Sequence, residues 1–220
     1  MNLRHKFSEE DLNRIRTAVK EAEDKVSGEI VPFIVERSGV YTIAHYKASL
    51  IAGTFFFVLM IFLDRYVFDP ATTTLYYDPV FIFFVVVAGA GFGALIPHLS
   101  DGVKRWLIPR DYQDACCRQA AENAFLEEEV FNTRQRTGIL IFISFFEHEV
   151  IVMADKGISR VVDHNEWDKV VKTLVSHIRA GNVTEGIVQG INMCGSILLE
   201  KGFNKTEDDV NELGDDLRIN

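Results

Sequence analysis

The sequence has few cysteines and fewer basic than acidic side chains, and both features exclude broad classes of protein. Cysteine occupies three of the 220 positions, an odd number without metal-like spacing. A disulfide framework is therefore excluded, and a reducing compartment is expected. The chain carries 23 Lys and Arg against 32 Asp and Glu, for a net charge of −9. Because a nucleic-acid interface needs clustered Lys and Arg, we expect no nucleic acid as a partner.

The short motifs that mark common catalytic sites are also absent. The sequence contains no GxSxG, Walker A, HExxH or GxGxxG pattern. Cys116 and Cys117 lie on a predicted helix with no obvious His partner. A cysteine phosphatase also needs an Arg six positions after the nucleophile, and the residue six positions after Cys117 is Asn123. The sequence therefore identifies no catalytic residue, and whether the protein is an enzyme stays open at this point.

Charge is missing from two long apolar stretches, residues 48–63 and 79–100. The second is long enough to cross a hydrocarbon core of roughly 30 Å, whereas the first spans about 24 Å as a helix. The first would have to extend through Tyr46 or through residues 66–68. No cleavable signal peptide is expected, because the first residues are strongly charged. We predict a transmembrane helical hairpin within residues 46–102. The alternative, a pair of buried core helices, is disfavoured because the second stretch has no polar face.

Basic residues flank the two stretches unevenly, and this asymmetry predicts their orientation. The connecting segment, residues 64–78, contains Arg65 as its only basic residue. The outer flanks contain Arg37, Lys47, Lys104, Arg105 and Arg110. Positively charged flanks stay in the cytoplasm, so we expect both termini there and the lipid bilayer as a partner.

Periodicity predicts an α/β fold around the hairpin. Helices are expected at 8–26, 111–130, 165–180 and 183–199, and strands at 29–37, 139–145 and 149–154. Pro32 indicates an edge position or an irregularity in the first strand, because proline cannot donate to a strand ladder. This order of elements predicts a small α/β/α sandwich that the two-helix transmembrane hairpin interrupts.

These segments define four parts of the chain. Residues 1–45 and 103–204 are expected to form the two pieces of one α/β domain, and residues 46–102 the hairpin between them. Residues 205–220 hold six acidic and two basic side chains. Such a charged end is typically solvated, so we expect a disordered tail.

A group of acidic residues follows the last predicted strand. Asp155, Asp163 and Glu166 offer oxygen ligands that suit a hard cation such as calcium or another divalent metal. The alternative is helix capping, because Asp163 and Glu166 have the spacing of a capping box. His148, between the two strands of the predicted hairpin, is interpreted as a solvated turn residue.

Several segments resemble the TPM domain. The resemblance lies in TGILIFIS at 137–144, EHEV at 147–150, ADKGI at 154–158 and Trp167, and in the opening FSEEDLNRIRTAVKEAEDKVSGEI. It covers roughly residues 7–37 and 110–203, and the predicted hairpin resembles the bacterial membrane-bound branch of the family. This resemblance implies the cytoplasmic (inner) membrane of a bacterium as the location. The resemblance implies an α/β sandwich with a central sheet. Asp155 and Asp163 match acidic positions in a loop region of the family.

Two functions are compatible with this resemblance, because family members differ in function. Relatives are linked to photosystem repair, acid phosphatase activity, calcium binding and modulation of a receptor channel, so the fold does not settle the function. We favour a membrane-tethered interaction or assembly and quality-control module for membrane protein complexes. The alternative is a weak acid phosphatase, a phosphomonoesterase that depends on a divalent metal.

Overall fold

The computed structural model describes residues 6–66, 78–206 and 211–220. The chain divides into two units. The α/β unit comprises Met1–Gly39 and Gln113–Asn220, and the helical unit comprises Val40–Tyr112. The segment between residues 66 and 78 and part of the acidic end, both discussed above, lie outside the described residues.

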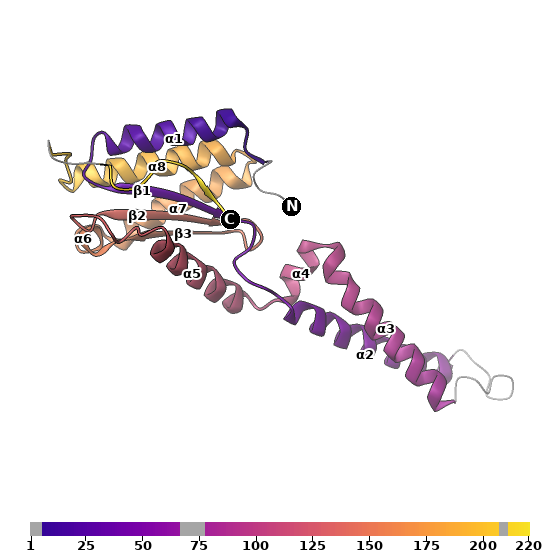
Figure 1. Cartoon of the computed structure of the whole chain (residues 1–220). Helices are drawn as coiled ribbons and strands as arrows, with labels where there is room; N and C mark the ends of the chain where they lie inside the picture. The colour runs from indigo at the N-terminus through magenta and orange to yellow at the C-terminus, as the bar shows by residue number, and fades with distance from the viewer. Residues whose placement is uncertain (1–5, 67–77, 207–210) are drawn as a thin grey trace. The chain divides into compact units, whose positions relative to one another are not determined.

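The α/β unit is built on a mixed sheet that, within the described residues, has the strand order β3-β2-β1-β4 (Figure 1). The strands are β1 (Glu29–Val35), β2 (Gly138–Ser144), β3 (Glu149–Ala154) and β4 (Arg218–Ile219). β1 runs parallel to β2 and to β4, whereas β2 and β3 form an antiparallel hairpin. The hairpin predicted from the polar turn between β2 and β3 is therefore confirmed.

Helices cover both faces of this sheet, which confirms the predicted α/β/α sandwich (Figure 1). The helices are α1 (Glu9–Glu23), α5 (Arg110–Glu127), α6 (Lys156–Ser159), α7 (His164–Arg179) and α8 (Val183–Glu200). Ile30 and Ile141 face a core formed with α1, α7 and α8, and Val31 and Leu140 face a smaller core formed with α5. Because both faces are covered, β1 and β2 are apolar at nearly every position.

Local sequence fixes where α1 begins. Ser8 and Asp11 form a capping box, in which each side chain accepts the backbone N–H of the other residue. The helix ends at Glu23, three residues before the predicted end, and Val26 instead forms an isolated bridge with Asn204.

Two groups complete the outer edge of β1, the edge that faces away from β2. The backbone N–H of Ile30 donates to the Glu23 side chain at 2.9 Å, and the carbonyl of Ile34 accepts from Asn220 at 3.0 Å. Pro32 lies on this edge between them and has no N–H to satisfy. β1 is an interior strand, yet it tolerates Pro32 because β4 pairs with β1 only from Phe33 onward.

The acidic end of the chain is not a disordered tail throughout, contrary to the sequence-based expectation. Its last residues form β4 beside β1. The Glu29 carboxylate accepts the backbone N–H groups of Glu212 and Leu213 at 3.0 and 3.2 Å. Arg218 pairs with Glu128 at 3.0 Å. The excess of acidic residues predicted solvation, but these contacts to the sheet bind the segment to the fold.

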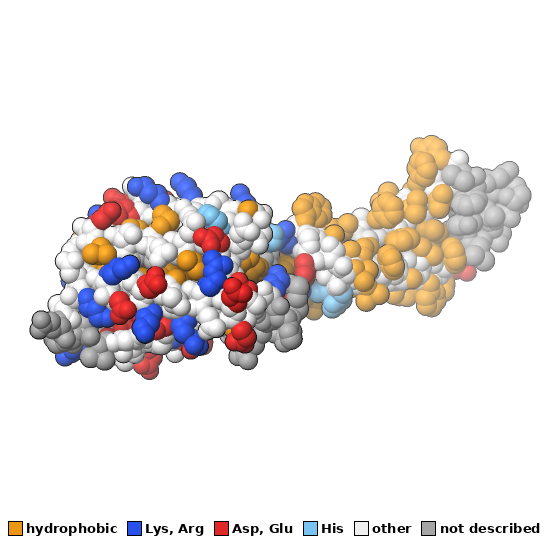
Figure 2. Space-filling view, turned by 90° about the horizontal axis from the view of Figure 1, so that it is seen from above, with side chains coloured by type: hydrophobic (Ala, Val, Ile, Leu, Met, Phe, Trp, Pro, Cys, Tyr) orange, Lys and Arg blue, Asp and Glu red, His pale blue; other side chains and the backbone are white. Residues whose placement is uncertain are grey.

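The helical unit consists of two long apolar helices and a short third helix. They are α2 (Ile43–Tyr66), α3 (Pro79–Leu99) and α4 (Asp101–Leu107). Both long helices are long and apolar enough to cross a membrane, and only 17% and 11% of their apolar windows are buried. Large exposed side chains on them include Leu50, Ile51, Phe55, Val58, Ile61, Phe62, Val80, Phe83, Phe84, Val87, Phe92 and Leu95 (Figure 2). The helices are therefore not buried core helices.

Small residues allow α2 and α3 to pack closely. A Cβ atom at Gly93 would lie 2.6 Å from the carbonyl oxygen of Ala48, and one at Gly53 would lie 3.2 Å from the Ala90 side chain. A Cβ at Gly91, on the same helix as Gly93, would meet no atom within 4 Å. Gly93 is thus a contact position and Gly91 is not.

We predict that Gly93→Ala destabilises the hairpin whereas Gly91→Ala does not. The added methyl at 93 presses on backbone, and such overpacking costs typically about 1–3 kcal/mol. The measurement is the thermal midpoint of the full chain in detergent, with Gly91→Ala as the matched control for the change in helix propensity. Equal midpoints for the two variants would contradict the packing described here.

Candidate functional site

A cleft with a volume of about 1070 Å³ opens in the α/β unit. It lies at the carboxyl end of β2, between the first turn of α1 and the turn that joins α7 to α8. β1 and β2 are parallel, and the carboxyl ends of parallel strands are where ligands bind in open α/β sheets. This cleft is therefore the candidate functional site.

Both charged and apolar side chains line the cleft. The charged set comprises Lys6, Asp11, Arg14, Glu149, Arg179 and Glu185, and the apolar set includes Phe7, Ile143, Phe145, Val150, Val175 and Ile178. Arg14 pairs with Glu185 across the cleft wall at 2.7 Å, and Lys6 lies 4.5 Å from the centre of the Phe145 ring. Hydrogen bonds from Ser8 lower the pKa of Asp11, so this carboxyl stays ionised. Such a mixed lining suits a partner with both apolar and charged groups.

The hairpin turn at the cleft contains a residue that the sequence did not reveal. Glu147 is 1% exposed, accepts the backbone N–H of Ser38 at 2.8 Å and accepts from the Ser144 hydroxyl. It therefore ties the β2–β3 turn to the segment after β1. His148, beside it, is exposed and adopts a φ of 58°, which agrees with a turn residue. No sequence signal separated the buried Glu147 from its exposed neighbour.

Asp155, one of the predicted calcium ligands, caps a short helix and pairs with an arginine. Its side chain accepts the backbone N–H of Lys156 and forms an ion pair with Arg136 at 2.6 Å. Asp155 is 5% exposed. The guanidinium of Arg136 thus supplies the positive charge that this buried carboxylate requires.

Asp163 and Glu166 are engaged by other partners. Asp163 caps α7 by accepting the backbone N–H of Asn165 at 3.1 Å, as the capping alternative predicted. Glu166 pairs with Lys201 at 2.7 Å, and their hydrogen bond raises the pKa of the lysine. To share an ion, Asp155 would have to release Arg136 and Glu166 would have to release Lys201. Among the described residues, no three His, Cys, Asp or Glu side chains are grouped as metal ligands. The calcium site stays a prediction.

The two buried cysteines, Cys117 and Cys194, do not provide a nucleophile. Burial raises the pKa of Cys117 to about 12, and it raises the pKa of Cys194 to about 12 as well. Both thiols are therefore protonated at neutral pH, and the thiolate is the reactive form.

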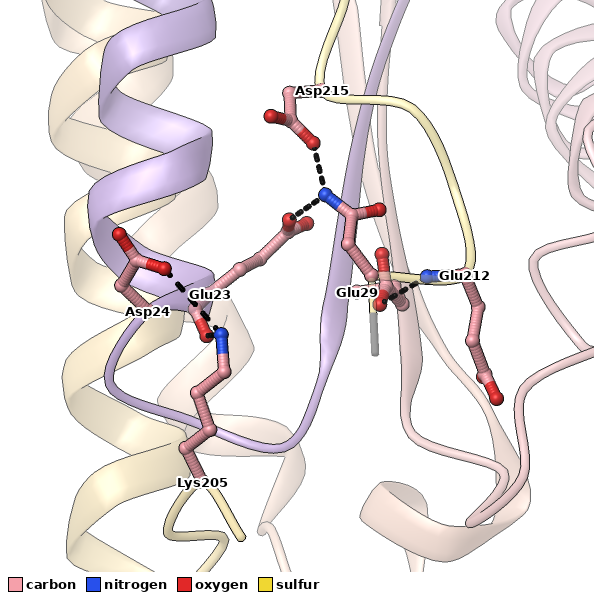
Figure 3. Close-up of polar contacts among 7 residues, drawn as sticks. Glu23, Asp24, Glu29, Lys205, Glu212 and Asp215 are labelled. Atoms are coloured by element: carbon pink, nitrogen blue, oxygen red, sulfur yellow. Dashed lines mark hydrogen bonds and ion pairs between the residues drawn. The ribbon is translucent and has the colours of Figure 1, made fainter. Parts of the chain in front are cut away.

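A second cluster of polar groups surrounds the buried Glu23 at the end of α1 (Figure 3). Asn211 donates to the carboxylates of Glu23 and Asp215, at 3.4 and 2.6 Å. Lys205 donates to the backbone carbonyl of Glu23 at 3.1 Å and approaches Asp24 at 3.4 Å. The cluster joins α1, β1 and the C-terminal segment at the edge of the sheet opposite β3.

The pKa of Glu23 is raised from 4.5 to about 8. Burial is the main cause, and the nearby carboxylates of Glu29 and Asp215 add to it. Between these two pKa values the folded chain holds a proton that the unfolded chain has lost. The free energy of unfolding therefore falls as the pH rises from about 4.5 to about 8, by at most about 1.4 kcal/mol per pH unit.

We predict that Glu23→Gln flattens this pH dependence. The amide keeps an oxygen for the Ile30 N–H but carries no charge at any pH, so the variant gains stability relative to the natural chain as the pH rises toward 8. The measurement is the free energy of unfolding of the full chain across this pH range. Glu21→Gln, an exposed glutamate on the same helix, is the control and should follow the natural chain. Parallel curves for Glu23→Gln and the natural chain would refute the assignment.

Comparisons with known proteins agree with this fold. Residues 106–197 match the family model described as the TPM domain. In fold, the chain is similar to the BA42 protein of the psychrophilic bacterium Bizionia argentinensis, solved by NMR, with a TM-score of 0.59 and 18% identity over 97% of this chain and 95% of that one. A search of curated proteins found no match. The predicted resemblance to the TPM domain is confirmed over residues 106–197.

Proposed function

We propose that this protein is a membrane-tethered TPM-domain protein whose α/β unit acts in the cytoplasm as an interaction or assembly and quality-control module for membrane protein complexes. The observation that carries the proposal is the outward apolar surface of α2 and α3. Soluble proteins rarely expose contiguous apolar surface of this extent. A hydrocarbon environment removes the free-energy cost of exposing that surface to water. At 1.5 Å per residue the two helices reach about 36 and 32 Å, enough for a core of roughly 30 Å.

The proposed orientation places both ends of the chain in the cytoplasm of a bacterium, below its inner membrane. Arg37, Lys47 and Arg110 flank the hairpin on the side that leads into the α/β unit. The segment between the spans has Arg65 as its only basic residue. The excess of basic residues is retained on the cytoplasmic side during insertion.

The cleft supports the proposed interaction role. Its apolar side chains and its several charges match the mixed chemistry of protein partners, in which a hydrophobic centre is bordered by polar groups. The hairpin would hold this cleft close to other membrane proteins and raise its effective concentration near them. We therefore propose a membrane protein complex as the partner of the cleft.

The alternative, a metal-dependent phosphomonoesterase, is favoured by one feature of the same cleft. Lys6, Arg14 and Arg179 line it together with His148, and cationic side chains are suited to a phosphate ester. Under this alternative the calcium or other divalent ion would be bound by Asp155, Asp163 and Glu166.

We predict a cytoplasmic signal from a reporter fused after Asn220 and an external signal from a reporter inserted at Thr73. The basic flanks generate this expectation. The measurement uses a reporter pair active on opposite sides of the membrane, in bacterial cells. The reverse pattern would reject the orientation, and release of the protein by alkaline extraction of membranes would reject the membrane tether.

A pair of charge reversals on α7 tests the role of the cleft. Arg179 lines the cleft, whereas Lys172 is exposed on the same helix outside it. We predict that Arg179→Glu reduces cross-linking of the full chain to membrane proteins in native membranes by about tenfold, the effect of losing one interfacial charge pair. Lys172→Glu should leave the cross-linked products unchanged.

A phosphatase assay on the natural chain and on one further variant separates the enzyme alternative from the interaction role. Hydrolysis of a generic phosphomonoester that requires calcium, and that is lost in Asp155→Asn/Asp163→Asn, would favour the phosphatase. Asparagine at 163 still caps α7, so this double variant should keep its fold. Unchanged cross-linking by Arg179→Glu would reject the cleft as the partner site.

A further inference from the structure

The end of the hairpin next to α4 combines exposed aromatic rings with basic side chains. We name this region the hairpin base and define it as Tyr46, Lys47, Lys104, Arg105 and Trp106. Trp106 is 80% exposed and Tyr46 is 74% exposed. Tryptophan and tyrosine are amphipathic rings that collect at the level of lipid headgroups. The chain has two tryptophans, and the other, Trp167, is buried in the α/β unit.

The backbone holds α4 as a separate helix at this end of α3. Ser100 adopts φ −151° and ψ 114°, which ends α3, and its hydroxyl accepts the backbone N–H of Val103 at 3.4 Å to start α4. Lys47 on α2 donates to the carbonyl of Leu107 at 3.1 Å and so fastens the end of α4 to the hairpin. Because α3 alone is about 32 Å long, a spanning α3 would place the break at Ser100 at the edge of a hydrocarbon core of roughly 30 Å.

Charge at the hairpin base is opposite in sign to the charge of the whole chain. Within residues 43–50 and 98–112 there are four basic side chains, Lys47, Lys104, Arg105 and Arg110, and two acidic ones, Asp101 and Asp111. The chain as a whole carries −9. A local positive charge beside an apolar hairpin is complementary to anionic headgroups, whose phosphates accept charge-assisted hydrogen bonds from Lys and Arg.

We propose that the hairpin base binds the headgroups of anionic phospholipids, with Lys104 and Arg105 against the phosphates and Trp106 at the interface. The proposal rests on the membrane-spanning hairpin proposed above. It gives the hairpin a second role, because it would recruit anionic lipid beside the spans rather than only anchor the chain.

The test uses the full chain reconstituted into vesicles of phosphatidylcholine and phosphatidylglycerol, in which one of the two lipids carries brominated acyl chains. Bromine quenches nearby tryptophan, so the difference between the two mixtures reports which lipid surrounds Trp106. Trp106→Phe leaves Trp167 as the remaining tryptophan and should lose the lipid-dependent quenching. We expect brominated phosphatidylglycerol to quench the natural chain more strongly than brominated phosphatidylcholine.

Charge variants identify the residues responsible. Lys104→Gln/Arg105→Gln should reduce the preference for phosphatidylglycerol by about fivefold or more, since each basic residue near a membrane surface contributes about that factor. Lys169→Gln/Lys172→Gln removes two exposed charges from α7 of the α/β unit and should keep the preference. High salt should weaken the preference of the natural chain, and this measurement needs no variant.

The outcomes distinguish this proposal from the membrane tether. Failure of the natural chain to float with vesicles would overturn the tether and the lipid site together. Flotation with equal quenching by the two lipids, or with a preference that survives high salt, would overturn the lipid site alone. An equal loss of preference in both double variants would also overturn it, because the effect would then follow net charge rather than the hairpin base.

Discussion

The parallel pairing of β1 with β2 is the interaction on which the rest of the α/β unit depends. It joins Glu29–Val35 to Gly138–Ser144 over seven residues, and both strands are buried along their whole length. Each side of this pair is covered by a different set of helices, so neither core can close unless the strands meet. On its other edge β1 is completed by the Glu23 carboxylate and by β4, which draws the C-terminal segment into the same interaction.

The proposed function has two parts, a membrane tether formed by the hairpin and a partner site formed by the cleft. The two units that carry them place their apolar side chains differently. α2 and α3 contact each other through small residues and present large apolar side chains outward. The α/β unit does the reverse: its apolar residues form the two cores, and, apart from a few buried carboxylates such as Glu23, Glu147 and Asp155, its charges lie toward the surface. The lining of the cleft combines the two kinds of side chain, which suits the proposed interaction with protein partners.

The sequence predicted the elements that depend on local pattern. The uncharged runs indicated α2 and α3, periodicity indicated α1, α7 and α8, and the polar turn indicated the β2–β3 hairpin. It could not predict contacts made by residues far apart. β4 has two residues and lies in an acidic segment, so no pattern marked it as a strand. Glu23 and Glu147 look like ordinary surface glutamates, and their burial depends on neighbours more than a hundred positions away. The cleft combines segments from α1, β2, α7 and α8, which no motif connects.

The pairing of Glu29 with Gly138 also sets the order of events during synthesis. The hairpin lies between them, so both apolar helices leave the ribosome before β2 exists. Throughout that interval α1 and β1 have no sheet partner in β2 and no helix layer from α7 and α8, and contacts across such a long loop form slowly. Under the proposed tether, the hairpin therefore enters the bilayer first and the α/β unit closes afterwards. Under the same proposal, a chain that failed to insert would expose its most apolar segment while β1 is still unpaired, and delivery to the membrane would be a condition for correct folding rather than its result.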